Sequence, residues 1–278
     1  PHYQQHTLLA AFAAEKLPED DPAWHRFSAH YAEWVSQPGW WRAAEQALWG
    51  NVMAGMAAAH QRQAWTLVLA YAGHLTEAWR RQGLYSLARQ GFAWALDAAG
   101  ETVDTAAEAQ VRLAWGQACL EQSDYAEAEQ HLAAAQRYFE SLSDTANLAE
   151  VYYHFSRLKM AQDAYTDAEN SIQQALRAYQ HLQDEKGVGK SRFRLGNILY
   201  HRGHYESAVS LAADAICSQK TVGDMLGLLR SHMLACSAYL QLGQIALAEE
   251  QCQTAAHLIE QVDDEAEHSI FYHVYADV

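Results

Sequence analysis

The sequence contains few of the residues that cross-link a chain or interrupt regular structure. It has only four prolines and four cysteines among 278 residues. The cysteines show no C-x-x-C spacing and no companion histidines at zinc-finger distance, so neither a disulfide framework nor a structural zinc site is indicated. Half of the residues are apolar and 19% are charged, which is typical of an ordered domain rather than a disordered chain.

Basic residues and long apolar runs are also scarce. The chain has 19 basic residues against 34 acidic ones and a formal net charge of -15, so a nucleic-acid backbone is repelled and direct nucleic-acid binding is not expected. No apolar run approaches the ~20 residues that cross a bilayer, and the segment PHYQQHTLLAAF lacks the features of a signal peptide. We therefore expect a cytoplasmic protein with no membrane contact. The start at Pro1 rather than at methionine indicates a piece of a longer polypeptide.

A regular repeat runs through most of the chain. Five similar strings, QGLYSLA, QSDYAEA, QDAYTDA, RGHYESA and LGQIALA, place their turn residues 40 apart, at Gly83, Ser123, Asp163, Gly203 and Gly243. A sixth copy, PGWWRAA, has its glycine at Gly39, which is 44 residues before Gly83. A fixed period of this length is the signature of a repeat architecture.

The residues around each turn indicate two helices. Two residues after the turn comes an aromatic or large apolar plug: Trp41, Tyr85, Tyr125, Tyr165, Tyr205 and Ile245. Three further on is an alanine in every copy: Ala44, Ala88, Ala128, Ala168, Ala208 and Ala248. Mostly apolar residues four and seven positions later complete an amphipathic stripe. Before the turn, a large residue followed by a small one marks the first helix, and we expect the small residue to meet the alanine of the second.

These patterns predict an all-α fold. Each repeat is a helix, a short turn near residue 39, 83, 123, 163, 203 or 243, and a second helix. About six such repeats are expected to stack into a right-handed α-α superhelix with a concave surface. We assign residues 1–22 to an amino-terminal capping helix, 23–264 to the repeat array, and 265–278 to a helix that caps the array or begins a further repeat.

The repeated residues resemble the tetratricopeptide repeat. One copy matches its pattern almost completely, at Leu195, Gly196, Gly203, Tyr205, Ala208 and Ala215. The resemblance covers about residues 24–262. The period of this chain exceeds the ~34 residues usual for this repeat, which implies longer helices or longer loops between repeats. The resemblance implies a non-catalytic domain that recognises a ligand or protein in its concave groove.

The amino-terminal segment adds a second resemblance. The string HTLLAAFAAEKL looks like the end of the winged-helix module in STAND-class (NB-ARC-like) signal-transduction ATPases, which leads into a tetratricopeptide sensor. The similarity is carried by His6, Leu8, Leu9, Phe12, Ala13, Ala14, Glu15 and Leu17. It implies that the chain is the sensor arm of such an ATPase, with the nucleotide-binding domain upstream as a partner. The alternative is a plain amphipathic capping helix.

No catalytic or cofactor motif is convincing. The string DEKGVGKS ends like a phosphate-binding loop, but Asp184 stands where the first glycine belongs, so we predict a helix start there. The same segment places Gly187, Gly189 and Lys190 where they could face an anion. His30, His74 and His154 share one column of the repeat, but helices ~8–10 Å apart are too far for ligands of one metal ion. We expect no enzyme activity, no metal and no cofactor.

All nine tryptophans lie within the first 115 residues. Large-core packing explains most of them. Trp34, Trp40, Trp49 and Trp65 are harder to place inside, and we expect them to form an exposed contact surface for upstream domains.

The candidate ligand site lies on the concave face. In this type of repeat the first helices line the groove, and their inward stripe collects positive charge in the carboxy-terminal half. The predicted ligand-binding residues are Tyr153, Arg157, Lys190, Arg194, Asn197, Tyr200, His201 and Arg230. Part of this set, Lys190, Arg194 and Asn197, resembles the carboxylate clamp of chaperone-binding tetratricopeptide domains. An alternative is a solvated helix face with ion pairs to Glu150 and Glu185.

These sequence features predict two alternative functions. The first is the sensor arm of a STAND-type signalling ATPase or regulator that binds an effector in its groove, either a protein, a peptide or a small anionic molecule. The second is a free-standing adaptor that binds an acidic peptide or the carboxyl terminus of a partner protein.

Overall fold

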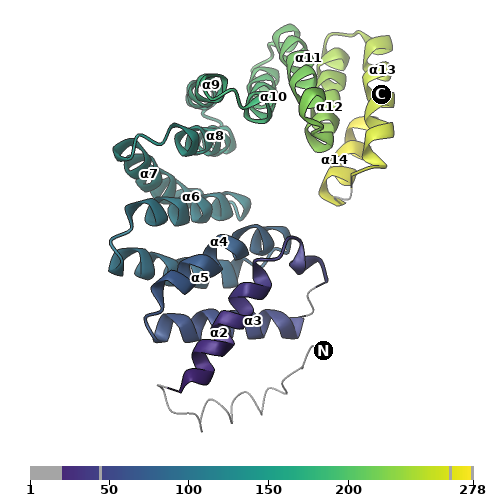
Figure 1. The fold of residues 1–278 in the computed structure, drawn as a ribbon. Coiled ribbons are helices and arrows are strands. Elements are labelled where there is room, and N and C mark those ends of the chain that lie inside the picture. Colours follow the sequence, from purple (N-terminus) through teal and green to yellow (C-terminus); the bar gives the residue numbers. More distant parts are fainter. Residues whose placement is uncertain (1–20, 44–45, 263–264, 277–278) are drawn as a thin grey trace. The chain divides into compact units, whose positions relative to one another are not determined.

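The computed structural model describes residues 21–43, 46–262 and 265–276. All regular structure in these residues is helical (Figure 1). The helices of the first half are α2 (Pro22–Val35), η1 (Trp40–Ala43), α3 (Gln46–Gln61), α4 (Trp65–Arg81), α5 (Tyr85–Glu101), α6 (Thr105–Glu121) and α7 (Tyr125–Ser141). Those of the second half are α8 (Thr145–Ala161), α9 (Tyr165–His181), α10 (Glu185–His201), α11 (Tyr205–Val222), α12 (Met225–Gln241), α13 (Ile245–Ile259) and α14 (Glu265–Ala276). The all-α repeat fold predicted from the sequence is therefore confirmed.

The chain divides into two compact bodies. The amino-terminal body comprises Pro1–Tyr138 and the carboxy-terminal body Phe139–Val278. The string HTLLAAFAAEKL and its resemblance to a winged-helix segment lie outside the described residues. No helix among the described residues is long and apolar enough to cross a membrane.

The long period arises from long helices rather than long loops. Each of the helices α4 to α10 has 17 residues, and three residues connect each to the next. The turns between repeats are therefore as short as the turns within them. The four extra residues of the first repeat fall between α2 and α3, where the short helix η1 lies.

The same turn geometry follows every helix from α3 to α12. A residue with positive φ stands at Gln63, Gly83, Val103, Ser123, Ser143, Asp163, Gln183, Gly203, Gly223 and Gly243. After α4, for example, the Leu84 amide donates to the Trp79 carbonyl at 2.9 Å and the Gly83 amide to the Arg80 carbonyl at 3.3 Å. These two bonds satisfy carbonyls at the helix end, as in a Schellman motif.

Aspartates begin four of the first helices. Asp104, Asp144, Asp184 and Asp224 occupy the same position in four successive repeats, and each carboxylate accepts a hydrogen bond from the amide three residues on, at 2.9–3.0 Å. Because the first turn of a helix has unpaired amides, this bond stabilises each helix start.

The predicted close contact between helices is confirmed. Ala88, Ala128, Ala168, Ala208 and Ala248 are all buried. A methyl group added at Gly116 would lie 3.4 Å from the Ala128 carbonyl, and one at Gly196 would lie 3.4 Å from the Ala208 carbonyl. The first copy of this alanine, Ala44, lies outside the described residues.

The predicted plug residues are less buried than expected. Tyr85, Tyr125, Tyr165 and Tyr205 are half-buried, and Ile245 is 48% exposed. Each stands in the first turn of its helix, where fewer neighbouring side chains cover it than at the alanine one turn later.

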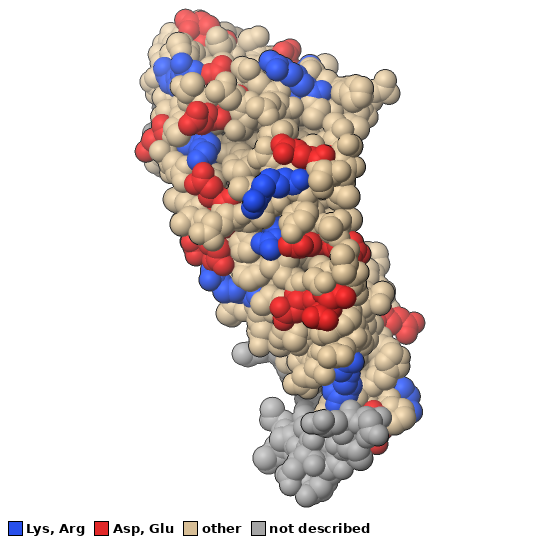
Figure 2. Space-filling model, turned by 90° about the vertical axis from the view of Figure 1, so that its left-hand side faces the viewer, with Lys and Arg blue, Asp and Glu red and all other residues tan. Residues whose placement is uncertain are grey.

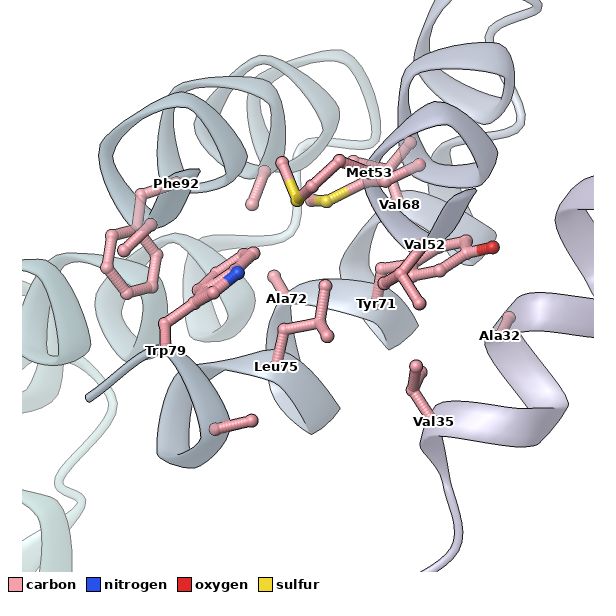
Figure 3. Close-up of a cluster of buried hydrophobic side chains, with 14 of the residues drawn as sticks. Ala32, Val35, Val52, Met53, Val68, Tyr71, Ala72, Leu75, Trp79 and Phe92 are labelled. Carbon is pink, nitrogen blue, oxygen red and sulfur yellow. The ribbon is translucent and has the colours of Figure 1, made fainter. Parts of the chain in front are cut away.

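The tryptophans build the core of the amino-terminal body. Trp40 and Trp49 are buried, and their rings lie 4.8 Å apart; the Trp34 ring lies 4.8 Å from that of Trp40. The expected exposed surface is therefore wrong for Trp40 and Trp49, while Trp34 and Trp65 are half-buried against the same core. Figure 3 shows a neighbouring part of this core, with Trp79 facing Phe92.

In the carboxy-terminal body the first helices lie together. The helix α10 contacts α12, and α12 contacts α14. Figure 1 shows α8, α10, α12 and α14 along one side of this body and α9, α11 and α13 along the other. The first helices therefore form a common face, as the repeat predicts. Near its end, the buried thiols of Cys236 and Cys252 interact.

Candidate anion-binding site

Helices α8 and α10 place five of the predicted ligand residues on one face. On α8, Arg157 follows Tyr153 by four residues; on α10, Arg194 follows Lys190 by four and Asn197 follows Arg194 by three. Residues three or four apart share a helix face. Since both are first helices of their repeats, the two stripes lie on the same side of the carboxy-terminal body.

The structure gathers these side chains around Tyr153. The ammonium of Lys190 lies 4.7 Å from the centre of the Tyr153 ring and 4.9 Å from that of Tyr179, on α9. It also donates to Glu150 Oε1 at 2.6 Å. We call the set Glu150, Tyr153, Arg157, Tyr179, Lys190 and Arg194 the Tyr153 cluster.

Arg194 lies one helix turn after Lys190 on α10 and is the third cation of the cluster. Its guanidinium carbon lies 5.8 Å from the Tyr153 ring and 5.8 Å from the Phe193 ring, and Nη1 contacts the Met160 sulfur at 3.9 Å. The guanidinium is thus held against aromatic and thioether groups. A weakly hydrated guanidinium tolerates such surroundings better than an ammonium does.

The electrostatics of Tyr153 show an excess of positive charge. Burial acts to raise the pKa of its phenol, but the charges of the three cations, Arg194 first, and a hydrogen bond with Arg194 hold this pKa below its ordinary value of 10.0. At Tyr179, burial and then the negative charge of Glu150 raise the pKa instead. A negative group is therefore favoured at the Tyr153 hydroxyl.

Glu150 is the carboxylate that faces Lys190. Both side chains are partly exposed, 36% for Glu150 and 27% for Lys190, and pairs of this kind contribute ~1 kcal/mol or less to stability. The pair agrees with the alternative interpretation of a solvated face with ion pairs. It leaves the field at Tyr153 positive, because the pKa of that phenol stays low with Glu150 in place.

Two buried polar atoms lie on the same stripe of α10. Arg194 Nε and Asn197 Oδ1 are buried with no hydrogen-bond partner among the described residues. Buried polar atoms are nearly always paired in native proteins.

Three predicted residues lie apart from the Tyr153 cluster. Arg230, on α12, donates from Nε to Glu267 on α14 at 2.8 Å. His201 is exposed and stacks on Tyr165 with ring centres 6.0 Å apart. Tyr200 contacts Tyr205, with ring centres 5.5 Å apart, and packs beside Leu234.

The segment that ends like a phosphate-binding loop is a helix start, as predicted. The Gly187 amide donates a hydrogen bond to the Asp184 carboxylate, so this amide is already paired and is not available to a bound anion. The glycines have packing roles: the Tyr179 ring lies directly against Gly187, and Gly189 faces Ser218 and Gln219 of α11. Side chains at these two positions would push α9 or α11 away.

Among the described residues, no group of three or more histidine, cysteine, aspartate or glutamate side chains could hold a metal ion.

On the face drawn in Figure 2, most basic side chains lie beside acidic ones.

One member of the cluster was missed by the sequence analysis. Tyr179 belongs to a second helix, and its column in the other repeats is mostly apolar: Ala59, Ala99, Phe139, Gln219 and Ile259. The pattern therefore marks the position as core, and a single hydroxyl is a weak signal for a site.

These helices, turns and contacts define a tetratricopeptide-like helical solenoid, and comparison with known proteins agrees. No family model and no curated protein matches the sequence. Aspartyl phosphate phosphatase F from Bacillus subtilis has a similar structure, with a TM-score of 0.68 at 14% identity over 95% of this chain and 71% of that one. NprR in complex with its cognate peptide NprX gives a TM-score of 0.62 at 13% identity over 97% of this chain and 77% of that one.

A third similar structure is a signal transduction ATPase with numerous domains, which has a tetratricopeptide repeat sensor and comes from Pyrococcus horikoshii. Its TM-score is 0.55 at 17% identity, over 91% of this chain and 42% of that protein. At these identities the likeness establishes the fold. The chain spans less than half the length of that ATPase.

Proposed function

We propose that this chain is a non-catalytic recognition domain that binds an acidic segment or terminal carboxylate of a protein or peptide at the Tyr153 cluster. The observation that carries the proposal is that Lys190 and Arg194 both lie against the ring of one half-buried tyrosine, whose pKa the charge of Arg157 also lowers. On a chain with a net charge of -15, this local excess of positive charge selects for an anionic group.

The arrangement suits a carboxylate for physical reasons. Lys190 and Arg194 lie one helix turn apart, so one ligand group can accept charge-assisted hydrogen bonds from both. Asn197, one turn further, offers an amide beside the same path. A peptide that follows α10 can therefore place its charged group at Lys190 and Arg194 and its backbone at Asn197.

The comparison with NprR supports a peptide as the ligand class. That protein was solved with its cognate peptide and shares the fold of this chain over nearly its whole length. Peptide binding is therefore compatible with this type of solenoid, and the positive charge of the Tyr153 cluster adds the preference for an acidic one.

A second function is the sensor arm of a STAND-type regulator. It is favoured by the similar ATPase with a tetratricopeptide sensor and by the resemblance of residues His6 to Leu17 to the segment that precedes such sensors. In that case the chain works with a nucleotide-binding domain upstream in its parent protein. Sequencing the encoding gene tests this directly: an upstream nucleotide-binding module supports the sensor, and a start codon next to Pro1 supports a free-standing adaptor.

Anion recognition can be tested with two labelled peptides. One is rich in glutamate and has a free carboxyl terminus; the other has glutamine in place of glutamate and an amidated terminus. We expect saturable binding of the first in fluorescence anisotropy, weakening as salt is added because exposed charges are screened. Equal binding of both peptides, or of neither, contradicts the proposal.

A further inference from the structure

The repeat places the rings of Tyr153 and Phe193 at equivalent positions of neighbouring first helices. The helices α8 and α10 start 40 residues apart, and the same interval separates Tyr153 from Phe193. Both rings are half-buried. Tyr153 is contacted by side chains of α10, and α12 supplies the equivalent side chains for Phe193. The surroundings of the two rings can therefore be compared position by position.

An apolar residue replaces a cation beside Phe193. On α10 the Arg194 guanidinium lies against the Tyr153 ring. The equivalent residue on α12 is Leu234, which is 6% exposed and packs in one apolar cluster with Phe193. Phe193 also lacks the hydroxyl through which Tyr153 bonds to Arg194. The surface at Phe193 is therefore suited to an apolar group rather than to an anion.

The second cation is neutralised in the next repeat. Lys190, which lies over the Tyr153 ring, corresponds to Arg230 on α12. Arg230 donates from Nε to Glu267 on α14 at 2.8 Å, and this glutamate is 5% exposed. Because a buried carboxylate is strongly destabilised without its cation, Arg230 offers less charge to a ligand than Lys190, whose partner Glu150 is 36% exposed.

Arg194 joins the two surfaces. Its guanidinium carbon lies 5.8 Å from the centre of the Tyr153 ring and 5.8 Å from the centre of the Phe193 ring. An anion bound to this guanidinium therefore lies beside an apolar surface. In an extended peptide, side chains two residues apart point the same way and stand ~7 Å apart. This spacing lets one of them reach Arg194 and the other reach Phe193.

From this arrangement, and on the basis of the function proposed above, we propose that Phe193 makes the site selective for acidic peptides that also carry a large apolar side chain. The acidic side chain binds at Lys190 and Arg194, and an apolar side chain two residues away packs on the Phe193 ring. A purely acidic peptide pairs with the cations but leaves this ring uncovered.

Two unlabelled peptides of equal charge separate the acidic from the apolar contribution. The probe is Ser-Leu-Ser-Glu-Glu-Glu-Ser-Leu-Ser with both termini blocked, and the control peptide has alanine in place of both leucines. A leucine stands two residues from the glutamate block on each side, so either orientation of the peptide presents one leucine to Phe193. Calorimetric titration measures the dissociation constant of each peptide for the full chain.

We expect the leucine peptide to bind the unaltered chain 5- to 10-fold more tightly than the alanine peptide. Leucine has three more carbons than alanine, and their partial burial against one ring accounts for a change of about this size. In Phe193→Ala the two peptides should bind within 2-fold of each other. Tyr125→Ala removes a half-buried aromatic ring from α7, in the amino-terminal body, and should keep the full difference.

A second variant guards against loss of folding. Phe193→Gln keeps more of the side-chain volume beside Leu234 and removes the aromatic ring. It should likewise abolish the preference for leucine, and it replaces Phe193→Ala if that variant is unfolded at the temperature of the titration.

Three results contradict this selectivity. Equal binding of the two peptides to the unaltered chain means that no apolar subsite adjoins the Tyr153 cluster, and it leaves the recognition of acidic peptides intact. An undiminished preference for leucine in the Phe193 variants assigns the apolar contact to another residue. Binding of neither peptide contradicts both this selectivity and the function proposed above.

Discussion

At the scale of single residues, the turn positions with positive φ differ in how well their side chains tolerate this backbone conformation. Five of the ten positive-φ residues between Gln63 and Gly243 are not glycine and not β-branched, and Val103 is the one β-branched side chain among those described. Its φ is 54° and its side chain is 81% exposed. A β-branched residue is strained in this region and gains no burial there to compensate.

Val103→Gly should therefore stabilise the chain by about 1 kcal/mol, because glycine adopts positive φ without steric cost. Thermal and urea unfolding measure the difference. The matched variant Val222→Gly alters an exposed valine inside the last turn of α11, where glycine costs helix stability. Stabilisation by both variants, or by neither, contradicts the assignment of strain to Val103.

His131 should make the folding stability of the chain depend on pH. Burial lowers the pKa of its imidazole from 6.5 to about 4, helped by the charges of Arg112 and Arg89. The side chain is 12% exposed and stacks on Trp115 at 4.3 Å. The unfolded chain takes up a proton near pH 6.5 and the folded chain only near pH 4, so stability falls as pH drops through this window.

The loss attributable to His131 should reach up to about 3 kcal/mol at pH 4. His131→Phe keeps an aromatic ring beside Trp115 and should flatten the fall of unfolding free energy between pH 6.5 and 4. Nuclear magnetic resonance titration of the imidazole reports its pKa directly. An ordinary value near 6.5 for His131 would show that this group does not drive acid destabilisation.

At the scale of helices, the contact between the two members of a repeat depends on small side chains. Ala208→Leu introduces three carbons where Gly196 approaches the α11 backbone and should cost ~1–3 kcal/mol through overpacking. Ala213→Leu is the matched change on an exposed position of the same helix, and we expect it to be nearly neutral. Two identical melting curves would mean that the alanine column does not set the helix spacing.

The ion pair between Arg230 and Glu267 links α12 to α14. Glu267 is 5% exposed, and the loss of its cation leaves a buried carboxylate with less compensation. Arg230→Ala should increase hydrogen exchange in α14 while exchange in α8 and α9 stays unchanged. Unaltered exchange in α14 would show that this pair does not hold the helix in place.

The sequence predicted the helices well because their signals repeat. The alanine column recurs in every repeat, and the turn inside the repeat holds glycine in four of six copies. Of the turns between repeats that the structure describes, only the last has glycine at positive φ, at Gly223; the others have Gln63, Val103, Ser143 and Gln183. These four residue types do not favour a left-handed turn, so the turns between repeats were harder to recognise from the sequence.

The candidate site was predicted in part. Helical spacing places Lys190 and Arg194 on one face, and the repeat register places Tyr153 and Arg157 beside them. The pairing of Arg230 with Glu267 depends on how α14 packs, which periodicity does not specify. The contact between Tyr179 and Lys190 was likewise not predicted, because the position of Tyr179 in the repeat is a core position.

At the scale of the whole molecule, a strongly acidic chain carries a positive cluster on the first helices of its carboxy-terminal body. We propose that this cluster binds an anionic ligand. A variant that removes its charges without disturbing the fold tests that claim. Such a variant is available because Lys190 and Arg194 are both partly exposed and neither stands at the alanine position where two helices touch.

The decisive measurement is calorimetric titration of the glutamate-rich peptide into two double variants with the same change of net charge. Lys190→Ala with Arg194→Ala removes two cluster cations; Arg177→Ala with Lys186→Ala removes two exposed cations outside it. At ~1.5–3 kcal/mol for each charge-assisted contact, the first variant should lose at least about 100-fold in affinity and keep its helicity and melting temperature. The second should bind like the unaltered chain. Unaltered affinity in the first variant, or an equal loss in both, would contradict recognition by the Tyr153 cluster.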